Sequence, residues 1–77
     1  MKTIADFKPG EIATLISFSG GMELQSRLVE MGFVPGVHMR IVKFSPWRGL
    51  VEIKIRSYHV SIRMSEAKKI MAKNYGN

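Results

Sequence analysis

The clearest hydrophobic pattern lies near the middle of the chain. Leu24, Leu28 and Met31 recur at positions i, i+4 and i+7, which is the spacing of one face of a helix. Polar and charged residues occupy most of the positions between them. This pattern predicts an α-helix over about residues 22–31, with one narrow apolar stripe turned toward a core.

The residues that follow this helix predict a sharp change of direction. Gly32 stands where a helix commonly ends in a left-handed conformation, and Phe33 is then placed to pack back on Leu28, as in a Schellman cap. Pro35 and Gly36 suit the centre of a type II turn, because proline presets φ and glycine supplies a positive φ. We therefore interpret Gly32, Pro35 and Gly36 as structural residues.

Alternation of apolar and polar residues predicts β-strands elsewhere. Four segments have this pattern or a short apolar run: residues 11–18, 37–44, 50–56 and 59–63. In the second of them the apolar phase shifts after Ile41, which predicts a bulge or a strong bend.

The C-terminal third leaves some boundaries open. Ser57 and Tyr58 are predicted to form a tight hairpin loop, although this pair lacks the glycine that such turns favour. Ser65 is a candidate N-cap of a short helix. Residues 70–72 fit either a continuation of that helix or a short closing strand, and residues 74–77 are predicted to form a frayed tail.

Together these elements predict a single mainly β domain over residues 1–77. Residues 7–10 and 33–36 both read F-x-P-G, and each precedes a strand-like run. Several short, bent strands with one helix indicate a small barrel, in which closure removes exposed strand edges. A chain of 77 residues has no room for a second core.

Composition limits the function classes. The chain has 12 Lys and Arg against 6 Asp and Glu, a net charge of +6, and no cysteine. The charge favours acidic partners, but the cations are dispersed rather than gathered as in a dedicated nucleic-acid patch. The absence of cysteine excludes disulfides and thiolate metal sites. The first residues match neither a secretory signal nor a membrane span, so we expect a cytoplasmic protein without membrane insertion.

No motif of an enzyme or of a tight metal site is present. The sequence lacks the phosphate-binding, nucleophile-elbow and zinc-protease motifs, so we expect neither catalysis nor a cofactor. His38 and His59 are the candidate metal ligands, both on outward strand phases and both without a second ligand at suitable spacing. Met31, Met39 and Met71 fall on predicted core phases, where methionine fills gaps.

The segment "SPWRGL" carries the most conspicuous aromatic feature. Trp47 either belongs to a binding surface or covers an open end of the barrel as a lid. Under the first interpretation the partner-binding residues are those of this loop together with nearby outward-facing cations: Pro46, Trp47, Arg48, Leu50, Arg40, Lys54 and Arg56.

The order of motifs along the chain resembles the ferrous iron transport protein A (FeoA) family. "RLVEMGFVPG" is similar to the family pattern R-L-x-E-[ML]-G-[FL]-x-P-G, and "SIRMSEAKKI" resembles its terminal L-R-x-x-E-A-x-x-I. Gly20 and Gly21 precede the first motif, and "VHMRIVKFSP" lies between the two. The chain departs from the family where "SPWRGL" replaces A-P-x-x-D-P, and where Ser57 replaces a glycine.

The resemblance implies an SH3-like β-barrel with an inserted helix and a short helical turn near the C-terminus. It also implies a small cytosolic, non-catalytic accessory of ferrous iron uptake that binds and modulates FeoB, a membrane transporter with a GTPase domain. Two alternatives remain at this point: a basic barrel that binds nucleic acid, and a module that senses transition metals. Self-association stays open.

Overall fold

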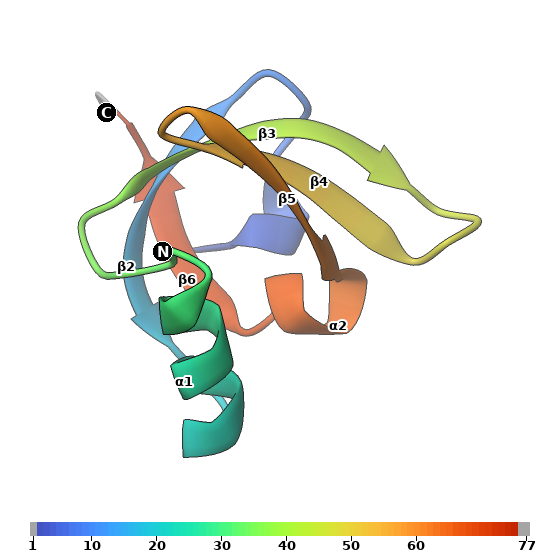
Figure 1. The fold of residues 1–77 in the computed structure, drawn as a ribbon. Coiled ribbons are helices and arrows are strands. Elements are labelled where there is room, and N and C mark those ends of the chain that lie inside the picture. Colours follow the sequence, from blue (N-terminus) through green and yellow to red (C-terminus); the bar gives the residue numbers. More distant parts are fainter. Residues whose placement is uncertain (1, 76–77) are drawn as a thin grey trace.

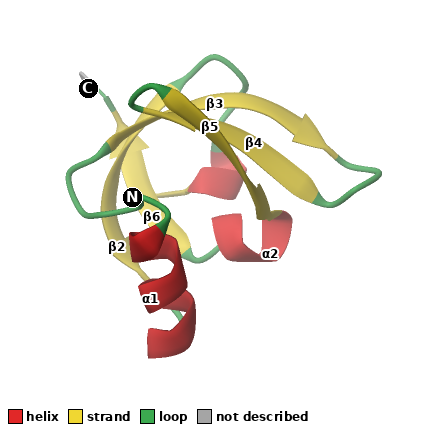
Figure 2. Cartoon of the chain, viewed as in Figure 1, coloured by secondary structure: helices red, strands yellow, loops and turns green. Residues whose placement is uncertain are grey.

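The computed structural model describes residues 2–75, which form six strands, two α-helices and one 3-10 helix (Figures 1 and 2). Their bounds in chain order are β1 Lys2–Thr3, η1 Ile4–Asp6, β2 Ile12–Phe18, α1 Met22–Glu30, β3 His38–Ser45, β4 Leu50–Ile55, β5 Tyr58–Arg63, α2 Met64–Ala67 and β6 Ile70–Asn74.

The strands form one antiparallel sheet in the order β1-β6-β2-β3-β4-β5. The sheet curves around a single core, while α1 projects from one side of it (Figure 1). A register shift between Ile41 and Lys43 confirms the predicted bulge in β3, and it bends this strand across the core. The prediction of a mainly β, SH3-like barrel with one inserted helix is confirmed.

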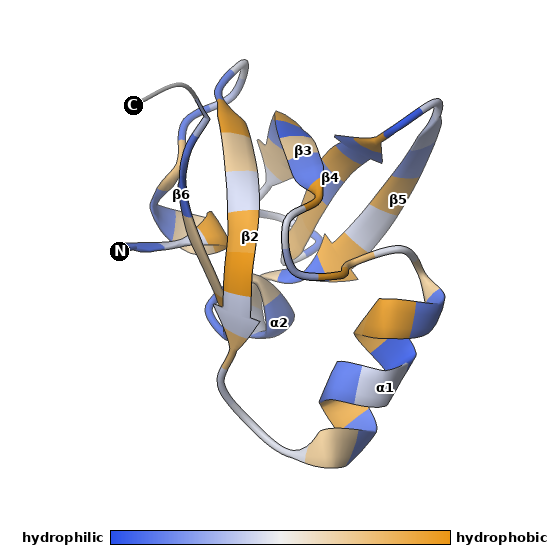
Figure 3. Cartoon of the chain, turned by 90° about the vertical axis from the view of Figure 1, so that its left-hand side faces the viewer, coloured by the Kyte–Doolittle hydropathy of each residue, from blue (hydrophilic) through white to orange (hydrophobic). Residues whose placement is uncertain are grey.

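The core consists of the inward-facing side chains of the strands together with the end of α1. Met39, Ile41 and Ile53 are fully buried, as are Leu28 and Phe33. Hydrophobic and hydrophilic residues alternate along β3 and β4 in Figure 3, as expected for strands with one face on a core. Full burial of one such aliphatic side chain is worth about 1.5–3 kcal/mol.

The end of α1 has the cap that the sequence predicts. Gly32 has a φ of +103°. Its N–H donates to the Val29 carbonyl at 3.0 Å, and the N–H of Phe33 donates to the Leu28 carbonyl, also at 3.0 Å. These two hydrogen bonds define a Schellman motif, which satisfies carbonyl groups left unpaired at the helix end.

The type II turn predicted at Pro35 and Gly36 is present, and the other F-x-P-G segment forms a similar turn. The Val37 N–H donates to the Val34 carbonyl at 3.0 Å across the pair Pro35 and Gly36, and Gly36 has a φ of +92°. The corresponding hydrogen bond across residues 8–11 is 3.1 Å long. Each turn aims the chain into the strand that follows it, so the repeated segment has a structural role.

The predicted loop between the fourth and fifth strand segments was wrong by one residue. Ile55 pairs with Tyr58, so the two-residue loop consists of Arg56 and Ser57 rather than Ser57 and Tyr58. Arg56 has a φ of +55°, as a primed turn requires of its first central residue. It therefore lies in the turn and not in the strand where the alternation placed it.

Two predictions for the C-terminal region also need correction. Ser65 lies inside α2, whose N-cap is Arg63, so Ser65 is not the cap. Residues 70–72 belong to strand β6, which resolves that alternative. Asn74 is still paired within β6, and the Tyr75 N–H donates to the Ile12 carbonyl at 2.9 Å. The predicted tail therefore does not begin at Asn74, and its remainder, residues 76–77, lies outside the described residues.

A buried carboxylate that the sequence analysis did not single out links the two helices. Glu66 on α2 is only 7% exposed. Its Oε1 accepts a hydrogen bond from the Arg63 N–H at 2.8 Å, and its Oε2 is paired with the Arg27 guanidinium on α1. Buried carboxylates need such partners, so this contact fixes the position of α1 against the barrel.

Candidate functional site

The loop between β3 and β4 forms a rigid, projecting tip. The Arg48 N–H donates to the Ser45 carbonyl at 3.0 Å, and the Gly49 N–H donates to the Pro46 carbonyl at 3.2 Å. The base of the loop is held by the Met64 N–H, which donates to the Gly49 carbonyl at 2.8 Å. In Figure 1 this hairpin extends away from the rest of the barrel.

Trp47 stands at this tip and is 99% exposed. An indole that covered the barrel would lose most of its solvent contact, so the lid interpretation was wrong. Pro46 and Arg48 are exposed beside it, whereas Leu50 is half-buried at the start of β4. A fully exposed tryptophan combines a large apolar surface with one N–H donor, a combination that is enriched in binding sites.

The outward-facing cations do not adjoin the tip, although the sequence predicted that they lie near it. Arg40 and Lys54 are cross-strand partners in the β3–β4 pair, while the pair next to the loop is Ser45 with Leu50. Five residues of strand separate Arg40 from Ser45, or roughly 17 Å. Arg56 lies farther still, in the turn at the opposite end of β4. The predicted single surface is therefore two surfaces.

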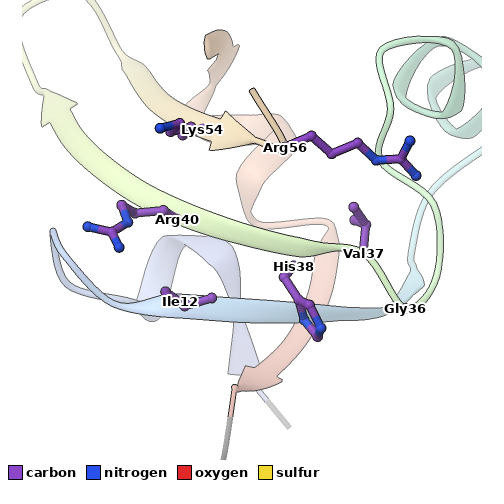
Figure 4. A pocket seen from close by; sticks show the side chains of 7 residues that line it. All are labelled: Ile12, Gly36, Val37, His38, Arg40, Lys54 and Arg56. Atoms are coloured by element: carbon purple, nitrogen blue, oxygen red, sulfur yellow. The ribbon is translucent and has the colours of Figure 1, made fainter. Parts of the chain in front are cut away.

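These cations instead line a groove over β2, β3 and the end of β4 (Figure 4). Its lining residues are Ile12, Gly36, Val37, His38, Arg40, Lys54 and Arg56. The alternation of residues along the strands predicted no shared role for Ile12, Val37 and His38. The type II turn could have indicated that these residues lie close together. It brings the start of β3 beside β2, where Thr14 pairs with His38.

The two candidate metal ligands lie on different parts of the sheet. The His38 ring packs against the Tyr75 ring in a tilted arrangement, with centroids 4.2 Å apart, and its Nδ1 lies 3.1 Å from the Thr14 hydroxyl. His59 lies on β5, with its Nδ1 3.6 Å from a carboxylate oxygen of Glu52. Within residues 2–75 no three His, Cys, Asp or Glu side chains are grouped as metal ligands.

Two exposed carboxylates have altered acidity. The Lys8 N–H donates to Glu11 at 2.7 Å and lowers the pKa of Glu11 below its usual 4.5, and Asn74 contributes a weaker hydrogen bond. The Thr3 N–H donates to Asp6 at 2.9 Å and likewise lowers the pKa of Asp6 below 3.8. Both carboxylates stabilise loops through backbone hydrogen bonds and lie outside the groove lining.

The described part of the chain contains no helix long and apolar enough to cross a membrane. Its fold is that of a small SH3-like β-barrel domain with an inserted helix and a projecting hairpin tip. A family model described as "FeoA domain" matches residues 2–74. Because this match spans nearly the whole chain, the chain belongs to the FeoA domain family.

The chain spans less than half the length of the two relatives described next. A fusion protein of Fe(2+) transport protein A and the Fe(2+) transporter FeoB from Porphyromonas gingivalis is 33% identical over 67 residues. That alignment covers 87% of this chain and 8% of the fusion protein. The solution structure of iron(II) transport protein A from Clostridium thermocellum is 31% identical with a TM-score of 0.87, over 96% of this chain and 46% of that one.

The same fold occurs in a different class of protein. A manganese-dependent transcriptional repressor in complex with manganese has a TM-score of 0.89 at 13% identity, over 95% of this chain and 36% of that one. Identity this low supports a shared fold and nothing about the function of this chain.

Proposed function

We propose that this chain is a non-catalytic accessory of ferrous iron uptake that acts in the cytoplasm by binding and modulating a FeoB-type transporter. The observation that carries this proposal is the relative in which the two parts form one polypeptide. Fusion holds two domains at a high effective concentration, which favours pairs of domains that work on each other.

We assign the transporter contact to the hairpin tip. Trp47 is fully exposed on a loop held by three backbone hydrogen bonds. A rigid tip loses little conformational entropy on binding, and tryptophan is enriched among residues that dominate interface energies. Pro46 and Arg48 flank the indole, and Leu50 adds apolar surface at the base. Pro46, Trp47 and Arg48 are all exposed, so none of these three side chains contributes to the core.

The test is binding of the purified chain to the detergent-solubilised FeoB-type transporter of the same organism. We expect Trp47→Ala to weaken binding at least about 30-fold, the effect of a 2 kcal/mol hot spot. Its thermal midpoint should not change, because the side chain has no buried contact to lose. Met22→Ala is the matched control, since Met22 is 82% exposed on α1, away from the tip.

Two negative results have different meanings in this experiment. If the unmodified chain fails to bind the transporter and leaves its GTP hydrolysis unchanged, the proposed function is wrong. If Trp47→Ala binds as tightly as the unmodified chain, the function stands and the assignment of the contact to the tip is wrong.

A further inference from the structure

The groove in Figure 4 is a second surface that the hairpin tip does not use. It lies toward the other end of β3 and β4, and two apolar side chains form part of its lining. Val37 is 9% exposed and Ile12 is half-buried. Gly36 adds backbone with no side chain, and a Cβ built there would meet nothing within 4 Å. A ligand can therefore approach this part of the backbone closely.

Cations surround this apolar floor in a regular arrangement. Arg40 and Lys54 are directly opposite each other in the β3–β4 register. His38 is two residues from Arg40 on the same outward face, and Arg56 is two residues beyond Lys54. Among residues 2–75 the ion pairs are Arg27 with Glu66 and His59 with Glu52, so these three Lys and Arg side chains have no acidic partner there.

This arrangement works against the stability of the fold. Like charges directly opposite each other on two strands are destabilising, and Arg40 and Lys54 form such a pair. Arg56 occupies a positive φ that favours glycine, asparagine or aspartate. The repulsion between Arg40 and Lys54 is relieved if an anion neutralises the charges when it binds, and the charge of Arg56 at the same groove adds to that attraction.

We propose that this groove binds an extended acidic peptide whose carboxylates occur at alternate positions. Side chains two residues apart in an extended strand lie on one side with a spacing of about 6.8 Å, and Lys54 and Arg56 are likewise two residues apart in the sequence. The acidic side chains face Arg40, Lys54 and Arg56, and the guanidinium groups accommodate carboxylates in bidentate fashion. An apolar residue of the peptide contacts Ile12 and Val37.

The lining favours a peptide over single-stranded nucleic acid. Sites for single strands combine cations with aromatic side chains on which bases stack. The groove lining contains no Phe, Tyr or Trp, and its one aromatic ring, that of His38, packs against Tyr75 beside the groove. The exposed Trp47 lies at the far end of the hairpin. An aliphatic floor with flanking cations suits alternating apolar and acidic side chains instead.

Fluorescence anisotropy with labelled synthetic peptides tests this proposal without the transporter. The probe is a hexapeptide of sequence EVEVEV, and the comparison peptide is EEEVVV, which has the same composition and charge. We expect EVEVEV to bind more tightly, with affinity that falls as salt rises. The double variant Arg40→Gln/Lys54→Gln should weaken binding at least about tenfold. It should melt no lower than the unmodified chain, because it removes a repulsive pair.

The matched control is Arg63→Gln/Lys68→Gln. It also replaces one arginine and one lysine, but at exposed positions outside the groove lining. We expect it to change affinity by less than about threefold. Equal losses in the two double variants would mean that net charge alone attracts the peptide, and the proposal would be wrong. It would also be wrong if neither peptide binds, or if an oligothymidylate of equal charge binds more tightly and depends on the same two residues.

Discussion

Replacing Gly32 with alanine tests the joint between α1 and the barrel. Gly32 has a φ of +103°, and a Cβ built there would overlap the Tyr58 hydroxyl. That hydroxyl donates a hydrogen bond to the Met31 carbonyl at 2.8 Å, at the end of the helix. Alanine would therefore strain the backbone and displace Tyr58 at the same time.

The two effects can be given magnitudes. A non-glycine residue at such a φ costs about 1–2 kcal/mol, and loss of the tyrosine hydrogen bond costs about 0.5–1.5 kcal/mol. Tyr58 is 41% exposed, so water replaces part of the lost bond and the lower values apply to it. For a domain of this size, each kcal/mol lowers the melting temperature by about 4–8 °C. We expect Gly32→Ala to melt roughly 6–20 °C below the unmodified chain.

Two further variants separate these effects in urea unfolding followed by circular dichroism. Gly36 has a φ of +92° and open space where its Cβ would lie, so Gly36→Ala carries the backbone cost alone. In Tyr58→Phe the obstructing oxygen is gone and Cζ lies 3.4 Å from the added Cβ, an ordinary contact. We expect Gly32→Ala to cost less in the Tyr58→Phe background. Strict additivity, or equal costs for the two alanine variants, would contradict the close approach of Tyr58.

Two other predictions concern carboxylates that stabilise the fold. Glu66→Ala should lower the free energy of unfolding by about 1–3 kcal/mol, because it removes the bond to the Arg63 N–H and the partner of Arg27. Arg27→Ala should cost less, since this arginine is half-exposed, and a larger effect of Arg27→Ala in urea unfolding would refute this account. Glu11 has a lowered pKa in the folded state, so its contribution is present above its unfolded value near 4.5 and is lost as pH falls through the folded pKa. Melting curves from pH 7 to pH 3 should show Glu11→Gln less stable at neutral pH and equal to the unmodified chain in acid; a difference that persists in acid would contradict the assignment.

Local chemistry explains which parts of the fold were predictable. The helix end at Gly32 and the turn at Pro35 and Gly36 depend on the φ preferences of those residues alone, and both were confirmed. The turn at Arg56 was missed because neither Arg nor Ser signals a primed turn. There the pairing of β4 with β5 determines where the loop falls. The cap at Ser65 was wrong because the helix begins earlier, at Met64, where the N–H of the N-cap residue Arg63 donates to the Glu66 side chain.

The candidate site was predictable only in part, for a different reason. The alternation of residues indicates the face of a strand on which Arg40 and Lys54 lie, and that assignment was confirmed by their exposure. It does not indicate which side chains of neighbouring strands share a depression, which depends on sheet curvature. Whether Trp47 covers the barrel or points away from it likewise depends on the direction of the whole hairpin.

The position of β6 has a consequence for how the chain acquires its structure. Although it is the last strand in sequence, β6 lies between β1 and β2, where Leu15 pairs with Ala72. The first three quarters of this chain contain both β3 and β4, which pair through a short loop and form early. Strand β2 can already pair with β3 along one edge, but its other edge has no strand partner until Ile70–Asn74 is added. The barrel therefore closes only when this last strand takes its place between β1 and β2.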